Sequence, residues 1–271
     1  MSRREALRPA RALALALALA LTAAGTPSRA QDFSSAAAPG PAPSPVAFLE
    51  HGLPPASCTP AAEATLTSWH QVPGLTTRAA GLGAGWRTLR AAAGLSQSGD
   101  PEIGWSALGF AVGAACPSWG AAVRGVLRRD RAPGTVGSAL GPGVGAEAGA
   151  AAWVEAARGV TAWAAAPQLW TRGVAPPLPR PLAIGARVEG GGLGAWLERE
   201  AAGASAPGRL AAGLGLVAGP LSIRVGARDH PLGGVLGFAA RASGFTVSAE
   251  VESHPVLAET LRIGIAVGAA R

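Results

Sequence analysis

The last fifty residues of the chain alternate between apolar side chains and polar or small ones. The alternation runs through four segments, 221–228, 233–241, 245–253 and 260–270. In 245–253, every odd-numbered position from Phe245 to Val251 is apolar. Side chains on a strand point to opposite faces with a period of two. The pattern therefore predicts strands with two faces in different environments, which suits a transmembrane β-barrel and a soluble β-sandwich equally.

Residues 1–30 have the organisation of a secretory signal peptide. Four Arg residues between positions 3 and 11 precede the apolar run 12–21, and small residues at Ser28 and Ala30 suit cleavage before Gln31. The apolar run is shorter than the roughly 20 residues that a membrane-spanning helix needs. We therefore expect a cleaved signal peptide and export, not a retained anchor.

The charge of the chain does not indicate a nucleic-acid partner. The formal net charge is +7, and all 23 basic residues are Arg. Five of these Arg residues and one Glu lie in the signal peptide, which leaves 18 Arg against 15 acidic residues, a net charge of +3. No basic patch large enough for nucleic acid is expected from this balance.

The mature chain divides into a lead-in and a repetitive region. Residues 31–60 are rich in Ala, Pro and Ser and are predicted to form a mobile periplasmic lead-in. Residues 61–271 are predicted to form the barrel, from segments of about ten residues each. The predicted strands are 62–71, 75–85, 88–97, 103–114, 118–128, 146–157, 160–170, 181–189, 192–200, 208–217, 220–228, 233–241, 245–253 and 260–270.

The connections between these segments alternate between short and long. Short turns such as Arg158-Gly159 and Gly190-Gly191 alternate with long connections such as 129–145 and 171–181. Outer-membrane barrels have short periplasmic turns and longer extracellular loops, whereas a sandwich has no reason to alternate in this way. The sequence therefore predicts an all-β fold, a transmembrane antiparallel up-and-down β-barrel of about 14 strands (range 12–14), in the outer membrane of a Gram-negative bacterium. The alternative is a secreted soluble β-sandwich that binds a ligand or a partner.

The Ala-rich region 146–170 has two interpretations. Ala is the best helix former, so an amphipathic helical hairpin competes with two strands. The segment 146–157 still alternates, and its neighbours are strands, so we expect strands here.

Nine charged side chains face the lumen if the apolar face of each strand points to lipid. They are Arg90, Arg124, Arg187, Glu198, Glu200, Arg224, Glu250, Glu252 and Arg262. Such residues can line a selective channel, or opposite charges can pair across a narrow, filled lumen. We favour pairing. The eight Trp residues are candidate interface anchors, but Trp105, Trp153 and Trp196 fall near strand interiors.

Two His-Pro pairs, His230-Pro231 and His254-Pro255, fall in predicted extracellular loops. Four scattered His residues give no metal-ligand spacing, so each Pro is expected to end a strand and each His to be solvated. No catalytic triad, phosphate loop or metal motif stands out, so we expect a non-enzymatic protein without a cofactor.

The only cysteines, Cys58 and Cys116, both fall on the periplasmic side of the predicted topology. In an oxidising compartment they can form a disulfide that ties the lead-in to the barrel rim. Two free thiols are the alternative.

The segment 253-SHPVLAETLRIGIAVG-268, with 221–252 before it, resembles the C-terminal region of FadL/PorV-like bacterial outer-membrane proteins. The family pattern His-Pro-x-Leu-Gly-x-Thr-(His)-Arg opens the last strand. The chain keeps His254, Pro255, Leu257, Thr260 and Arg262 of this pattern, with Ala258 in place of Gly.

The resemblance covers about fifty residues and implies a fourteen-stranded barrel. The roles in that family range from uptake of hydrophobic compounds to a shuttle in a protein-secretion system. The lead-in shows no plug-like segment of the kind found in fatty-acid transporters, which argues against uptake. We expect a structural, transport or secretion-associated role, with outer-membrane lipid and other envelope or secretion proteins as partners. A passive channel for small or hydrophobic solutes is the alternative.

Overall fold

The computed structural model describes residues 44–71, 75–99, 104–131, 143–173, 182–202, 208–230 and 232–268. The strands are β1 (Ala61–Ser68), β2 (Thr76–Trp86), β3 (Leu89–Gly99), β4 (Gly104–Cys116), β5 (Trp119–Arg131), β6 (Val144–Ala157), β7 (Val160–Gly173), β8 (Ala183–Gly190), β9 (Leu193–Glu200), β10 (Arg209–Ala218), β11 (Leu221–Arg228), β12 (Gly233–Ala242), β13 (Phe245–Glu252) and β14 (Thr260–Val267).

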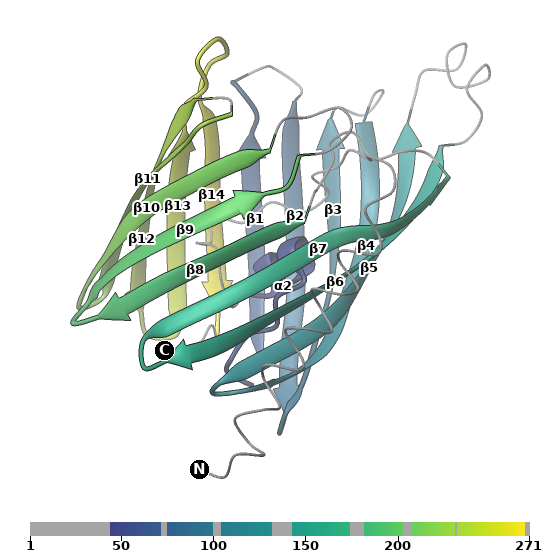
Figure 1. Ribbon diagram of the computed structural model, residues 1–271. Helices are drawn as coiled ribbons and strands as arrows, with labels where there is room; N and C mark the ends of the chain where they lie inside the picture. The colour runs from purple at the N-terminus through teal and green to yellow at the C-terminus, as the bar shows by residue number, and fades with distance from the viewer. Residues whose placement is uncertain are drawn as a thin grey trace.

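These fourteen described strands form a closed antiparallel barrel (Figure 1). Each strand pairs with the next along the chain, and β1 pairs with β14 from Ala62↔Val267 to Ser68↔Leu261. The predicted all-β up-and-down barrel of about 14 strands is therefore confirmed. The soluble β-sandwich is wrong, because a single closed sheet leaves no second sheet to pack against. No described helix is long and apolar enough to span a membrane.

The Ala-rich region consists of strands β6 and β7, not of a helical hairpin. The two strands pair along most of their length, with register shifts between Ala148 and Ala150 and between Glu155 and Ala157. On its other side, β6 pairs with β5, and β7 pairs with β8 from Val160 to Ala165. This tertiary context overrides the helix propensity of Ala, because pairing with neighbouring strands supplies hydrogen-bond partners for the backbone along most of β6 and the first part of β7.

The barrel has two ends with different connections. At one end, here the turn end, two residues join successive strands, as at 158–159, 191–192 and 219–220. Gly191 and Gly192 both have positive φ, 61° and 82°, the pattern of a type I′ hairpin turn that matches the twist of the strands. At the opposite end, here the loop end, four or more residues separate the strands. β1 begins and β14 finishes at the turn end, because the strand number is even.

The outer surface of the barrel is apolar. Large aliphatic side chains alternate outward along the strands and remain highly exposed, for example Leu82 (67%), Leu95 (64%) and Leu214 (61%). A soluble protein rarely exposes so large an apolar surface. The outer wall therefore suits a lipid environment.

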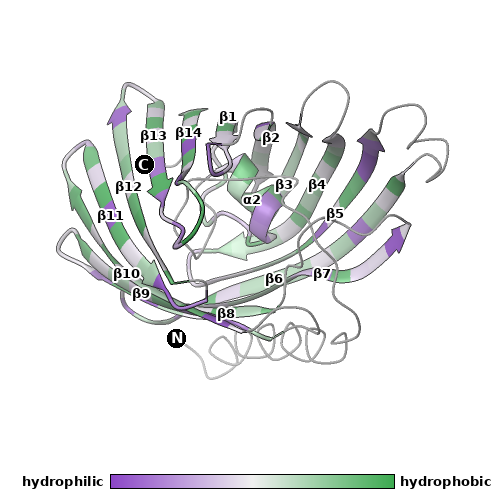
Figure 2. Ribbon diagram, turned by 90° about the horizontal axis from the view of Figure 1, so that it is seen from above, coloured by the Kyte–Doolittle hydropathy of each residue, from purple (hydrophilic) through white to green (hydrophobic). Residues whose placement is uncertain are grey.

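A short helix, α2 (Pro45–His51), lies inside the barrel (Figure 2). The Ser44 side chain caps it at the N-terminus, Pro45 opens the first turn, and Gly52 ends it with a φ of 73°. Val46, Phe48 and Leu49 are at most 1% exposed, and the helix contacts β1 to β4 and β7. The expectation of a mobile lead-in without a plug is wrong for this part of residues 31–60. The reason is that its apolar side chains pack against Ala residues that line the wall, such as Ala79 and Ala111.

Replacing Leu214 with Arg tests whether the outer wall contacts lipid. Leu214 lies halfway along β10 and points outward. We expect the free energy of unfolding from lipid vesicles to fall by about 2 kcal/mol, because an Arg near the bilayer midplane is poorly solvated even when its side chain reaches toward the headgroups. Leu193→Arg, at the turn end of β9, is the matched control and should cost less than about 1 kcal/mol. Equal and small effects at both positions would contradict a lipid-facing wall.

Candidate functional site

The structure places all nine charged residues that were expected in the lumen on the inward face of their strands. They divide between two regions. Arg90 and Arg124 contact the segment that contains α2, whereas the other seven lie on β8, β9, β11, β13 and β14. The two regions differ in burial and therefore in what they can do.

Arg124 fastens the interior segment to the wall. Its Nε donates to Leu49 O at 2.7 Å, and one terminal nitrogen donates to Pro167 O at 2.6 Å. The other terminal nitrogen pairs with a Glu147 carboxylate oxygen at 2.9 Å. Glu147 also accepts from Gln168 at 2.9 Å. Arg124 and Glu147 are 1% and 5% exposed, so the ion pair is buried and its charges are satisfied inside the protein.

Further polar contacts hold the first turn of α2 and the residues that follow the helix. Arg90 donates to the carbonyls of Pro55 (3.1 Å) and Ala56 (2.8 Å). The indole N–H of Trp153 donates to Pro54 O at 2.8 Å. Glu63 accepts from the backbone N–H of Val46 at 3.0 Å. We name residues 44–56 the plug, because wall side chains hold it at several points inside the lumen.

Sequence reasoning missed the roles of Glu63, Glu147 and Trp153. The alternation of side chains along β1 and β6 places both Glu residues on the inward face. The segment that they contact, however, was expected outside the barrel. The only sequence signal for these two Glu residues was their position in the alternation of each strand, which indicates the inward face but not the contact made there.

Three Trp residues lie in the lumen and not at an interface. Trp153 and Trp163 are 3% and 1% exposed, and Trp196 packs against the same cluster. Trp163 sits against Gly185, where an added Cβ would come within 2.2 Å of its ring, so glycine is required there. The Trp163 indole donates to Glu198 at 3.0 Å. These three Trp residues are therefore not interface anchors, although all eight Trp residues were candidates for that role.

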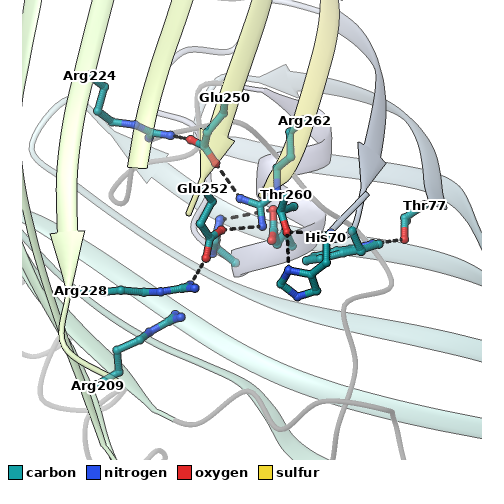
Figure 3. Close-up of polar contacts among 12 residues, drawn as sticks. His70, Thr77, Arg209, Arg224, Arg228, Glu250, Glu252, Thr260 and Arg262 are labelled. Carbon is teal, nitrogen blue, oxygen red and sulfur yellow. Dashed lines mark hydrogen bonds and ion pairs between the residues drawn. The ribbon is translucent and has the colours of Figure 1, made fainter. Parts of the chain in front are cut away.

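A group of five charged residues lies near the loop end, on the lumen face of β11, β13 and β14 (Figure 3). We name it the charge cluster; it consists of Arg224, Arg228, Glu250, Glu252 and Arg262. Glu250 pairs with Arg224 on one side and with Arg262, at 2.7 Å, on the other. Glu252 pairs with Arg228 and lies 3.5 Å from Arg262. The register Glu250↔Arg262 between β13 and β14 brings the central pair together.

Two more ion pairs continue this side of the lumen. Glu200 of β9 pairs with Arg209 of β10, and Arg187 lies 3.3 Å from Glu189 on β8. The side chains of Arg209 and Arg187 are 31% and 24% exposed, in contrast to 1% for Arg124. Water therefore reaches the lumen face of β8 to β10, whereas the plug covers the face of β1 to β7.

The loops next to the closing strands pack against each other. The His70 ring lies 5.1 Å from the His254 ring, and its Nδ1 lies 3.0 Å from Ala258 O. His254 Nδ1 accepts from the backbone N–H groups of Val256 and Leu257 at 3.2 and 3.0 Å. Loss of hydration and the nearby His70 lower the pKa of His254. This His is therefore a neutral acceptor that orders its loop.

The other predicted loop residues play local roles. His230 lies 3.2 Å from Asp229, and Pro255 follows His254 in the loop after β13, while Pro231 lies outside the described residues. Among the described residues, no three His, Cys, Asp or Glu side chains are grouped so that they could hold a metal ion.

Cys58 and Cys116 are free thiols in the structure, so the suggested disulfide is not formed. Cys58 lies against β2, where an added Cβ on Gly85 would come within 2.7 Å of it. Cys116 finishes β4 at the turn end.

Comparisons with known proteins give likenesses of fold. No protein-family model and no curated protein matches the chain. Among solved structures, a triple mutant of the Rhodopseudomonas blastica porin has a TM-score of 0.45 and 15% identity, and the match covers 78% of this chain and 99% of that one. A double mutant of the same porin has a TM-score of 0.44 and 14% identity, with the same coverage.

Proposed function

We propose that the protein is a porin-like outer-membrane β-barrel through which small solutes pass along one side of a plugged lumen. The apolar outer wall and the predicted signal peptide support the location. The two-residue turns would face the periplasm and the loop end the cell exterior, in line with the usual arrangement of such barrels. No reacting group is needed for this role, so the protein is proposed to be non-enzymatic.

The contrast between the two sides of the lumen carries the proposal. On one side the plug contacts the wall through buried apolar side chains and the Arg124–Glu147 pair. On the other side, Arg187, Glu200 and Arg209 keep about a quarter of their side-chain surface exposed. We name this hydrated side of the lumen, which is lined by paired charges, the lane. Such a passage admits small polar solutes and excludes larger ones.

The charges along this lane nearly balance. The charge cluster and the Glu200–Arg209 pair together contain four Arg and three Glu residues. Because each charge has an opposite partner, the lane should discriminate weakly between small anions and cations.

Single-channel conductance in planar bilayers tests the proposal. We expect the full-length protein to show a small conductance. A variant without residues 44–56 should conduct several times more current, because the plug occupies the lumen face of β1 to β7. The absence of current in both proteins would show that the lane is closed, and would leave a purely structural role.

A second variant asks whether the plug must move. An added Cβ at Gly83 would lie 3.4 Å from the Pro45 Cβ, which is close to the spacing of a disulfide. In a background with Cys58→Ser and Cys116→Ser, the pair Pro45→Cys and Gly83→Cys should lock the plug to β2. We expect the locked protein to conduct like the unlocked one. Current that appears only after reduction would show that solutes pass by plug displacement instead.

Secretion-associated and hydrophobic-uptake roles follow from the resemblance to FadL/PorV-like proteins. Transport is favoured over a purely structural barrel, because Arg187, Glu200 and Arg209 stay partly exposed on the side of the lumen that the plug does not cover. Hydrophobic uptake has less support, because the hydrated lane is lined by ion pairs.

A further inference from the structure

The outer wall carries a groove near the loop end. Its volume is about 1110 Å³, and residues from β13, β14 and β1 to β6 line it. It lies outside the barrel, because its large side chains, such as Leu66, Leu95 and Leu127, belong to the exposed face of their strands. The alternate residues of the same strands, such as Ala79 and Ala107, are buried toward the plug. Figure 2 shows this part of the wall, from β14 to β3, over α2.

The strand register arranges the groove in two rows. The first row is apolar and runs through directly paired positions, Ile265, Ala64, Ala80, Leu95, Leu108 and Leu127. The small Ala64↔Ala80 pair stands between larger side chains, which hollows the wall at this place. The surface has the chemistry and the width to hold several acyl chains side by side.

The second row is polar and lies two residues closer to the loop end. It consists of Arg78, Gln97, Ser106 and Arg129, which are paired directly from β2 to β5. Arg78, Gln97 and Arg129 are exposed on the outer face. Within the described ranges, neither Arg78 nor Arg129 forms an ion pair with an acidic side chain. The outward-facing Arg residues of this row can bind an anionic headgroup, and the apolar row beside them can contact the acyl chains of the same lipid.

The spacing of the two Arg residues restricts the headgroup. They stand three strands apart, roughly 14 Å at the usual strand separation. Two phosphates on one headgroup would occupy both guanidinium groups, and the Gln97 and Ser106 side chains between them can bind sugar hydroxyls.

We infer that the outer groove binds one bisphosphorylated, multiply acylated glycolipid of the extracellular leaflet, with its phosphates on Arg78 and Arg129 and its acyl chains along the apolar row. This inference rests on the proposed outer-membrane orientation, which puts the loop end outside the cell. The lipid would fix the height of the barrel in the bilayer and fill the hollow at the Ala64↔Ala80 pair.

Native mass spectrometry of the full-length protein in detergent, with lipid A as the probe, tests the inference. We expect one bound lipid A per wild-type barrel. Arg78→Gln combined with Arg129→Gln should weaken binding at least about tenfold, because two charge-assisted contacts are lost. Arg199→Gln is the matched control. Arg199 also faces outward near the loop end of its strand, β9, but it lies outside the groove. It should bind like wild type.

Two further arms separate the headgroup from the acyl chains. Ala80→Trp fills the floor of the groove and should weaken binding although both Arg residues remain. Monophosphoryl lipid A and phosphatidylglycerol should bind more weakly to the wild type than lipid A. Equal binding by the double Arg variant, or an equal loss in Arg199→Gln, would overturn the inference and indicate diffuse attraction.

Conductance of the same variants distinguishes this inference from the proposed function. A wild-type protein that conducts current but binds lipid A no better than the double Arg variant does would refute the groove alone. A wild-type protein that inserts and binds lipid A without any current would refute the transport role alone.

Discussion

Replacing Arg124 with Met should lower the free energy of unfolding by about 3–5 kcal/mol, the usual cost of removing one partner from a buried ion pair. The change leaves the Glu147 carboxylate buried without its cation and removes the donors to Leu49 O and Pro167 O. Denaturant unfolding from lipid vesicles, followed by Trp fluorescence, measures the loss. The plug should also become accessible to protease, because Arg124 is one of its main attachments.

Two controls make this result specific. Arg158→Met, in an exposed turn at the turn end, should change stability by less than about 0.5 kcal/mol. Arg124→Met combined with Glu147→Leu should recover much of the loss, because no uncompensated carboxylate then remains. If the double variant were as unstable as the single one, the ion pair would not be the source of the effect.

Replacing Glu250 with Gln should lower the free energy of unfolding by roughly 3 kcal/mol, at the low end for a broken buried pair because its partners retain some contact with water. Glu250 is the acid between Arg224 and Arg262, whose side chains are 14% and 12% exposed. The substitution removes the negative charge that lies between the guanidinium groups of Arg224 and Arg262. The lane then gains a positive charge, so the reversal potential in a salt gradient should shift toward anion preference.

Glu189→Gln is the matched control for Glu250. Glu189 also pairs with an Arg, Arg187, but its side chain is 56% exposed. An exposed pair contributes about 0–1 kcal/mol, so stability should hardly change. An unchanged ion preference in Glu250→Gln, together with a measurable current, would show that solutes do not pass along the charge cluster.

The predicted strand pattern was close to the observed one because its signals are local. Whether a residue such as Arg224 faces the lumen follows from its parity within one strand. The turns followed in the same way from Gly residues. The turn predicted at Gly190-Gly191 lies one residue later, at Gly191-Gly192, where positive φ at both residues suits a two-residue hairpin. For 146–170 the local signal was ambiguous, and pairing with β5 and β8 decided it.

The candidate site was predicted only in part. All nine charged residues face inward, yet their partners depend on how the strands are staggered. Arg224 and Glu250 meet across β12, and Arg124 meets a backbone carbonyl 75 residues away in sequence. Residues 31–60 gave a compositional signal for a linker, which does not reveal that Val46, Phe48 and Leu49 can be buried by a wall of small side chains.

The sequence by itself determined the approximate number of strands (12–14), the face on which each side chain lies and the alternation of short turns with long loops, because these follow from patterns within single strands and turns. The tertiary structure alone decided the position of the plug, the pairing in the charge cluster and the polar row of the outer groove. The physical reason is register. Closing the sheet fixes the height of every strand relative to its neighbours, and that height determines which charges and which small residues become adjacent.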